Sequence, residues 1–183
     1  RRDNLSDKNI IEHSIQLNDA SFDVFIAELN PEIVIFDRFM TEEQFGWRAE
    51  KYAPNALRVL QTSDLHCLRA ARENTLESSL KTDNQQGPVL DDGEQLAALI
   101  RREPLALREI TSLLRCDLNI MISQSEINLL IQQFNFLPEQ LCYCPFLLQP
   151  NNNFLPFDAR TDFVTIGNFL HAPNWDSVQW LAH

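Results

Sequence analysis

The sequence predicts an α/β protein built on a Rossmann-like parallel sheet flanked by helices. Short apolar runs alternate along the chain with longer stretches whose apolar residues recur at helical spacing. The apolar runs are continuous, as in strands that are covered on both faces. In open parallel sheets, ligands bind beyond the carboxyl ends of the strands. We therefore expect a functional site among the residues that follow each strand.

Each predicted element follows from its own local signals. The apolar runs predict strands at 33–36, 57–60, 118–122, 141–144 and 163–166, with a weaker one at 15–17. Helical periodicity predicts helices at 21–29, 41–52, 65–80, 94–115 and 124–134, and a last one beginning near 173. Pro104 either kinks the fourth helix or starts a separate one. Ser123 and Glu126 form a predicted capping box, and Thr41 is the expected cap of the second helix.

The chain is expected to contain parts of two domains. Residues 149–161 combine two prolines with three asparagines, which is the composition of a linker. This divides the chain into a domain at 1–148 and the start of another, its first βα unit, at 162–183. The sequence begins with Arg1 and its last residues read as a helix that has just begun, so we expect a fragment of a longer chain. The polar stretch 81–93 is predicted to be a mobile loop.

Composition narrows the class of protein. Of 183 residues, 44% are hydrophobic and 22% are charged, which is ordinary for a globular protein. The net charge of −11 disfavours general nucleic-acid binding, because an acidic surface repels phosphates. No apolar run approaches the ~20 residues that span a bilayer, so we expect no membrane span and a cytoplasmic protein.

The four cysteines favour no metal site. Cys142 and Cys144 form a C-x-C pair on a predicted strand, so both side chains point to one face and a shared metal is one alternative. The usual zinc spacings are absent. With Cys67 and Cys116, they are better interpreted as reduced, buried thiols of a cytoplasmic protein.

The first candidate constellation is FDRFMTEEQFGWR, residues 36–48. Asp37 and Arg38 follow a predicted strand, where a carboxylate can accept a hydrogen bond from a sugar hydroxyl or act as a base, and an arginine can bind a phosphate or carboxylate. Glu42 and Glu43 belong to the same stretch, although they also suit the first turn of a helix. The structural alternative is that Asp37 pairs with Arg38 or Arg48 and only ties the loop to the helix.

The second constellation is TSDLHCLRAAR, residues 62–72. Asp64 and His66 follow a strand, and a carboxylate directed at an imidazole is a common general-base arrangement. Arg69 lies three residues after His66, so the two share a helix face. Alternatively, Asp64 is only the cap of the helix and His66 a residue of its first turn.

The third constellation is IGNFLHAPNWDSVQWL, residues 166–181. Gly167 after a strand would let the backbone approach a ligand closely, and a helix amino terminus can face a diphosphate. Trp175 and Trp180 are expected to pack into a core or a domain interface. If they are exposed in the fragment, a homodimer of the fragment is expected to be an artefact of that exposure. The motifs of P-loop ATPases, dinucleotide-binding dehydrogenases, zinc proteases and α/β-hydrolases are absent from this sequence.

Several of these motifs resemble one enzyme family. FVTIGNF at 163–169, with Pro173-Asn174 and Asp176, resembles the opening of the donor-side domain in family-4-type (group 1) glycosyltransferases of the GT-B fold. ISQSE at 122–126 is similar to the step that ends their acceptor-side domain. The stretches 30–48 and 58–72 resemble a poorly characterised branch of these enzymes, marked by FDRFMTEEQFGWR. The resemblance covers nearly the whole chain.

This resemblance implies an enzyme that transfers a sugar from a nucleotide-sugar co-substrate to an acceptor held between two domains, with retention of configuration and without a metal or other cofactor. Residues 1–148 would form the acceptor-side domain. By the same resemblance, Asp37, Arg38, Asp64 and His66 would line the cleft on the acceptor side, and the donor-binding residues Gly167 and Asn168 would lie near the donor diphosphate. Together with the residue patterns above, we predict catalytic roles for Asp37, Asp64 and His66. We predict acceptor-binding roles for Arg38, Glu42, Glu43 and Arg69. The fragment by itself is expected to be inactive, because half of the site is missing. The alternative is a non-catalytic Rossmann-like module that binds a ligand or partner.

Overall fold

The computed structural model describes residues 5–81, 93–149, 154–170 and 172–182. The chain divides into two compact units, Arg1–Leu147 and Leu148–His183. The predicted loop at 81–93 falls almost entirely outside the described residues.

The first unit contains a four-stranded parallel sheet in the order β1-β2-β3-β4. The strands are β1 (Ile33–Asp37), β2 (Leu57–Gln61), β3 (Leu118–Met121) and β4 (Leu141–Tyr143). A parallel sheet flanked by helices confirms the predicted α/β class and is consistent with a Rossmann-like sheet. The weak strand predicted at 15–17 is wrong: this segment is irregular, and Leu17 is exposed. Ile15 packs against the smaller apolar cluster, but no strand of the sheet pairs with this segment, and a strand needs such a neighbour for its backbone hydrogen bonds.

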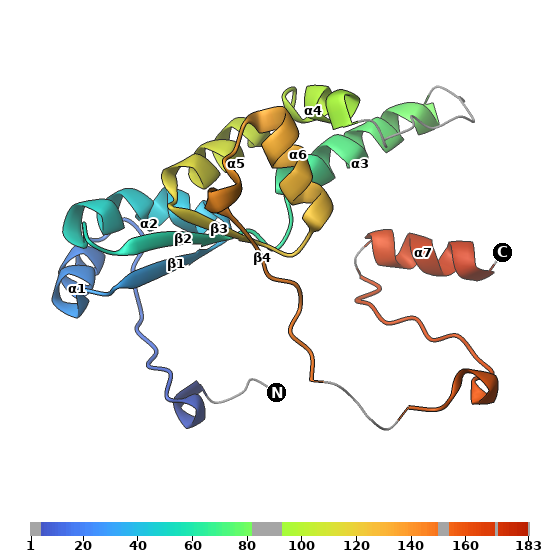
Figure 1. Ribbon diagram of the computed structural model, residues 1–183, viewed down its shortest axis with the longest axis horizontal. Coiled ribbons are helices and arrows are strands. Elements are labelled where there is room, and N and C mark those ends of the chain that lie inside the picture. Colours follow the sequence, from blue (N-terminus) through green and yellow to red (C-terminus); the bar gives the residue numbers. More distant parts are fainter. Residues whose placement is uncertain (1–4, 82–92, 150–153, 171, 183) are drawn as a thin grey trace. The chain divides into compact units, whose positions relative to one another are not determined.

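The helices of this unit are α1 (Ser21–Leu29), α2 (Phe39–Tyr52), α3 (His66–Lys81), α4 (Gly93–Ile100), α5 (Pro104–Arg115) and α6 (Gln124–Phe134). One helix, α1, precedes β1, and the others lie in the connections: α2 between β1 and β2, α3 to α5 between β2 and β3, and α6 between β3 and β4 (Figure 1). Short 3-10 turns occupy Leu5–Lys8 and Pro138–Gln140. Of the two alternatives for Pro104, the second is confirmed, because it occupies the first turn of a separate helix. α2 begins at Phe39, so Thr41 lies inside the helix and donates its hydroxyl to the Asp37 carbonyl.

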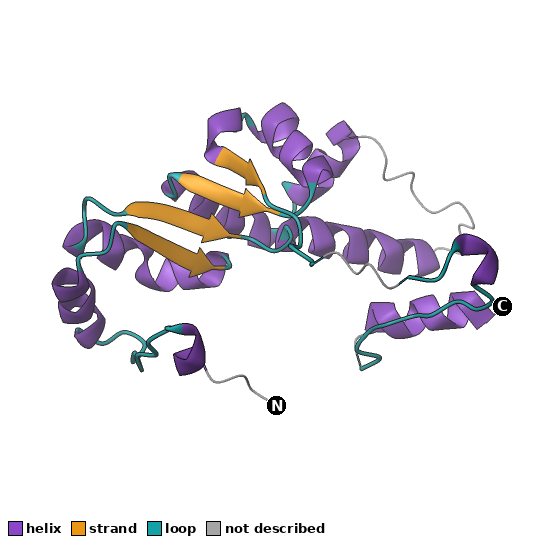
Figure 2. Ribbon diagram, turned by 60° about the horizontal axis from the view of Figure 1, so that its bottom comes forward, coloured by secondary structure: helices purple, strands orange, loops and turns teal. Residues whose placement is uncertain are grey.

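The connecting helices cover one face of the sheet, as Figure 2 shows. Each crossover runs in the same direction along the sheet, and right-handed crossovers that do so place their helices on the same face. On this face Phe36, Leu60 and Met121 are buried against the helices. From the helices, Leu113 and Leu130 are completely buried in the same core. The hydrophobic effect of this layer holds the sheet edge in place.

The opposite face of the sheet is exposed at β1, whereas Val59 of β2, which points to this same face, is only 3% exposed. Ile33 and Ile35 point to this face and are 54% and 57% exposed, while the alternating residues Val34 and Phe36 point to the helices. The continuous apolar runs predict strands covered on both faces; the helices cover one face, and on the other face the β1 residues Ile33 and Ile35 stay exposed.

The second unit contains a 3-10 turn at Phe157–Ala159 and α7 (Ala172–Ala182). The strand predicted at 163–166 is wrong, since these residues form an irregular segment in which Phe163 and Ile166 are fully exposed. A strand needs a neighbour for its backbone hydrogen bonds, and the described residues of this unit contain no other strand. Trp175 and Trp180 are exposed by 54% and 80%, so neither packs into a core here. Among the described helices of both units, none has the length and apolarity that crossing a bilayer requires.

Candidate functional site

The carboxyl ends of β1 and β2 lie side by side. The backbone N–H of Arg38 donates to the carbonyl of Gln61 at 2.8 Å, which extends the pairing one residue past β1. The ring of Phe39 then meets the imidazole of His66 edge-on, with centroids 5.6 Å apart. The first two constellations predicted from the sequence are therefore neighbours at one edge of the sheet.

Both strand ends turn through an unusual backbone conformation. Arg38 has φ 66° and ψ 156°, and Ser63 has φ 62°. The other non-glycine residues with positive φ in the described part of the chain are asparagines, which tolerate this region. A conformation like that of Arg38 costs about 1–3 kcal/mol and clusters at functional sites. The two strained turns thus lie at the same edge of the sheet as the polar residues that follow β1 and β2.

Asp37 lies at this edge but on the open face. Its side chain is 73% exposed and faces the guanidinium of Arg38 at 3.9 Å, a distance worth little in water. The alternative pairing with Arg48 is wrong, because Arg48 binds the carboxylate of Asp23 at 2.7 Å and thereby ties α2 to α1. Asp37 is therefore a weakly engaged carboxylate at the end of β1.

Asp64, His66 and Arg69 form a cluster at the end of β2. The Asp64 carboxylate accepts a hydrogen bond from Arg69 at 2.7 Å, and its other oxygen lies 3.7 Å from Nε2 of His66. Asp64 is not the cap of α3, because the first N–H groups of that helix have other partners. The structure thus brings together the three predicted residues of this stretch.

Two glutamates from distant helices occupy the start of α3. Glu109 of α5, only 2% exposed, accepts from the N–H of His66 at 3.0 Å and from that of Cys67 at 2.7 Å. Glu126 of α6 accepts from the N–H of Leu65 at 3.3 Å. Carboxylates are favourable at this end of a helix because of its free N–H groups and dipole. Since these N–H groups already have negatively charged acceptors, this helix start is unfavourable for a phosphate.

Glu126 forms only half of the capping box that the sequence predicts. Its N–H does bond to the Ser123 hydroxyl at 3.4 Å, so Ser123 caps α6 as expected. Its carboxylate, however, turns away from its own helix toward Leu65. Burial raises the pKa of Glu126, and the charge of Asp64 raises it further, against the opposing effects of the Leu65 N–H and of Arg72. The result is a partly buried carboxylate that holds a proton more tightly than an exposed glutamate.

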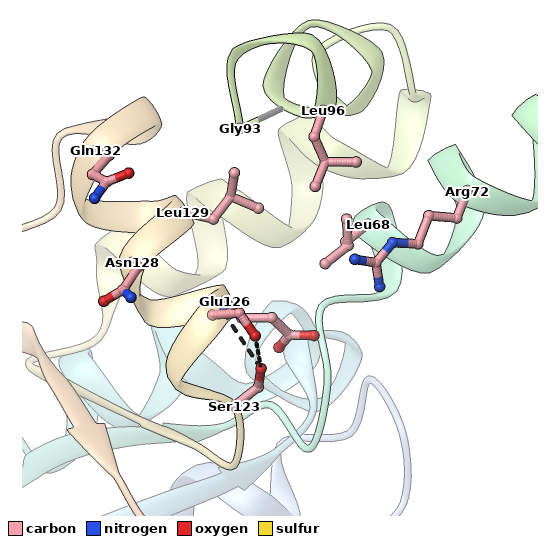
Figure 3. A pocket seen from close by; sticks show the side chains of 10 residues that line it. Leu68, Arg72, Gly93, Leu96, Ser123, Glu126, Asn128, Leu129 and Gln132 are labelled. Carbon is pink, nitrogen blue, oxygen red and sulfur yellow. Dashed lines mark hydrogen bonds between the residues drawn. The ribbon is translucent and has the colours of Figure 1, made fainter. Parts of the chain in front are cut away.

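Two hollows open beside Glu126. The larger, about 360 Å³, lies between α3, α4 and α6, and the smaller, about 300 Å³, lies beside Asp64 and Arg69. Leu68, Arg72 and Glu126 line both. Figure 3 shows the larger hollow, with Arg72 from α3 and Glu126 from α6 extending toward each other across it. Hollows of this size hold small ligands.

Glu42 and Glu43 face a different way. Both oxygens of Glu42 bind the guanidinium of Arg115, and the side chain is nearly completely buried. Glu43 makes a two-point pair with Arg108 at 2.9 and 2.6 Å. These pairs tie α2 to α5, so this geometry presents neither carboxylate to an acceptor.

The predicted donor-binding residues belong to the second unit. The carbonyl of Asn168 accepts from the side-chain amide of Asn174 at 3.1 Å, and that amide also packs against Gly167. Their role toward a donor stays a prediction.

The cysteines differ from their interpretation as four buried thiols. Cys67 and Cys116 are buried, whereas Cys142 is exposed and Cys144 partly so. Burial raises the pKa of Cys116 to about 12, and that of Cys67 still further with help from Glu109. Over the described residues, no group of three or more His, Cys, Asp or Glu side chains is placed to hold a metal ion.

Sequence reasoning missed Glu109, Glu126 and Arg72 as members of the site. Glu109 gives a usable signal, because it lies three residues after Ala106 and four before Leu113, within the apolar stripe of α5. A charged residue in such a stripe needs a buried partner. Glu126 was assigned to its own helix cap, and Arg72 gave no signal of its own.

No protein-family model, no curated protein and no solved structure matches this chain. The fold and the site alone therefore define the class of protein to which this chain belongs. It is an α/β protein with a parallel sheet, whose polar, strained edge carries two adjoining hollows.

Proposed function

We propose that this chain forms the acceptor-binding part of a nucleotide-sugar glycosyltransferase. The observation that supports it most is the hollow at the carboxyl end of β2, which Asp64, Arg69, Arg72 and Glu126 line together. Carboxylates and arginines gathered at this edge suit a ligand rich in hydroxyl groups. The resemblance of the flanking motifs to GT-B enzymes supports the same class.

The reaction assigns roles to the residues at this edge. A hydroxyl of the acceptor attacks the anomeric carbon of the donor sugar, and the nucleoside diphosphate leaves. The pair Asp64–His66 supplies a carboxylate beside an imidazole for moving the proton, and exposed Asp37 can orient a hydroxyl from the end of β1. The diphosphate would be held elsewhere, because carboxylates fill the start of α3.

The test is sugar transfer by the full-length protein with a panel of UDP-, GDP- and ADP-sugars. Release of nucleoside diphosphate should depend on an acceptor. Asp37→Asn and Asp64→Asn should each reduce turnover at least ~10²-fold if they handle the acceptor hydroxyl. Glu28→Gln, an exposed carboxylate of α1, is the matched control and should change nothing. Unchanged turnover in both aspartate variants, with the fold intact, would contradict the assigned roles.

A non-catalytic binding module is the second candidate. It is favoured by the engagement of Asp64, whose carboxylate already has Arg69 and His66 as partners. Calorimetry distinguishes the two, since a binding module would give heat with a ligand but no turnover of any nucleotide sugar.

A further inference from the structure

The two hollows beside Glu126 form one continuous binding surface. They share the side chains of Leu68, Arg72 and Glu126, so a ligand that fills both must pass over these three residues. Their volumes, about 360 and 300 Å³, are each suited to one small ring-shaped unit. A ligand that fits this surface is therefore extended.

Glu126 offers one oxygen to such a ligand. Its Oε2 is held by the N–H of Leu65, which fixes the carboxylate. Its Oε1 has no hydrogen bond to any described residue, and it does not belong to their buried unsatisfied atoms, so it is reachable from the hollows. A fixed carboxylate with an accessible oxygen is well suited to accept a hydrogen bond from a hydroxyl group.

Arg72 supplies the complementary donors. Within the described residues it makes no hydrogen bond and no ion pair closer than 4 Å, although its charge acts on Glu126. Its guanidinium lies across the hollow from the carboxylate (Figure 3). A ligand between the two meets an acceptor on one side and donors on the other, as the hydroxyl groups of a sugar require.

The larger hollow has the lining that a sugar ring needs. Leucines provide apolar surface, and around them stand uncharged polar side chains that can both donate and accept: Ser125, Asn128 and Gln132. Such a lining suits a ring with C–H groups on its faces and hydroxyl groups on its rim.

We propose that the acceptor is an oligosaccharide of at least two sugar units. Its reacting unit lies in the smaller hollow beside Asp64, and the next unit lies in the larger hollow between α3, α4 and α6. Hydroxyl groups at the junction bind Glu126 and Arg72. This inference rests on the proposed function for the identity of the ligand as an acceptor, but its binding can be measured without a donor.

The test compares sugars of two lengths on the 183-residue chain. Maltose, cellobiose, lactose and α-1,2-mannobiose are titrated by NMR chemical-shift perturbation, together with glucose, galactose and mannose. We expect at least one disaccharide to bind at least about tenfold more tightly than its monosaccharides, which corresponds to the contacts of one further unit. Shifts should reach both hollows. If no disaccharide exceeds its monosaccharides, or none binds, the inference is overturned.

Two variants locate the second unit. Gln132→Ala, an exposed position at the larger hollow, should weaken the disaccharide about fivefold or more and leave the monosaccharide unchanged. Gln95→Ala on α4, which is exposed and outside the hollow, is the matched control. Glu126→Gln should weaken both sugars, because Glu126 lies at the junction. Equal effects of Gln132→Ala on the disaccharide and the monosaccharide would contradict the placement of the second sugar unit in the larger hollow.

Transfer assays on the full-length protein separate this inference from the proposed function. Disaccharide binding without transfer from any nucleotide sugar would leave the binding site intact and refute the transferase. Transfer to monosaccharides and disaccharides with the same KM would leave the transferase intact and refute the extended acceptor.

Discussion

Two pairs of glutamates in the first unit have different partners. Glu42 and Glu43 of α2 meet the guanidinium groups of Arg115 and Arg108, and each carboxylate uses both oxygens. Glu109 and Glu126 meet backbone N–H groups at the start of α3. A carboxylate that binds an arginine through both oxygens has no free oxygen, whereas a carboxylate held by a single N–H keeps one oxygen free for a ligand. The difference separates structural carboxylates from the one that can meet a ligand.

The largest effect is expected at Glu109. Glu109→Ala leaves two N–H groups at the start of α3 without acceptors, one of them in the core at Cys67. Since an unsatisfied buried group costs about 1–3 kcal/mol, we expect a loss of about 3 kcal/mol in the free energy of unfolding. Urea denaturation followed by circular dichroism measures it. Glu109→Gln keeps one accepting oxygen and should lose less; a loss equal to that of the alanine variant would contradict this account.

Glu42 comes next. Glu42→Ala removes a nearly buried carboxylate but leaves Arg115, which is 41% exposed and can reach water. The expected loss lies between that of a surface pair and that of a buried one, about 1–2 kcal/mol. The same denaturation measurement applies, and a loss below ~0.5 kcal/mol would make the pair equivalent to a surface pair.

A substitution at Gly46 tests whether the Glu42 carboxylate is held in its ion pair with Arg115. A Cβ at Gly46 would overlap the carboxylate of Glu42, so the glycine makes room for the ion pair one helical turn away. Gly46→Ala should therefore destabilise the protein, although alanine favours helix by about 1 kcal/mol. In the Glu42→Ala background the overlap is gone, and the same substitution should stabilise. A stabilising Gly46→Ala in both backgrounds would show that the carboxylate is not held there.

Local signals explain which elements the sequence predicted. The predicted helices 21–29 and 124–134 have the same bounds in the structure, because helical spacing runs through each segment and an asparagine with left-handed backbone, Asn30 or Asn135, follows it. Ser123 also caps the second of these helices. The strands at 15–17 and 163–166 failed because a strand depends on a neighbour that no local pattern reveals. Ile33–Asp37 succeeded because β2 pairs with it.

The candidate site shows the same limit. The cluster of Asp64 and Arg69 was predictable, because its members lie five residues apart at a strand end. Glu109 and Glu126 reach α3 from 42 to 61 residues away, and Arg115 reaches Glu42 from 73 residues away. Spacing along the chain cannot distinguish these partnerships, since tertiary packing decides which carboxylate meets an arginine and which meets a free N–H.

A pH experiment tests the environment of Glu126. Ionising this carboxylate costs more in the fold than in the unfolded chain, because burial raises its pKa above the ordinary 4.5. The folded state then binds more protons, so stability falls as pH rises from 4.5 to the raised pKa and is constant above it. Glu126→Gln lacks this titration.

The expected result is that the difference in the free energy of unfolding between wild type and Glu126→Gln changes with pH. Relative to wild type, Glu126→Gln should become more stable as the pH is raised from 4 to 7, measured by urea denaturation at each pH. Asp64, Arg72 and Glu109 also act on this carboxylate and are present in both proteins, so their own titration largely cancels. A difference that stays constant, or that moves in favour of wild type, contradicts the raised pKa.

The smallest effect is expected at Glu43. Its partner Arg108 is more than half exposed, so solvent and salt screen the two-point pair. Glu43→Ala should leave the free energy of unfolding unchanged within the error of the measurement, in contrast to Glu42→Ala one position earlier on the same helix. Arg108→Ala is the matched control, with the reservation that it also removes the contact of its guanidinium with the Phe39 ring, 5.4 Å away. If Glu43→Ala destabilised as much as Glu42→Ala, burial would not be what distinguishes the two carboxylates. Glu42, Glu43 and their two arginine partners would then have to act as one network between α2 and α5.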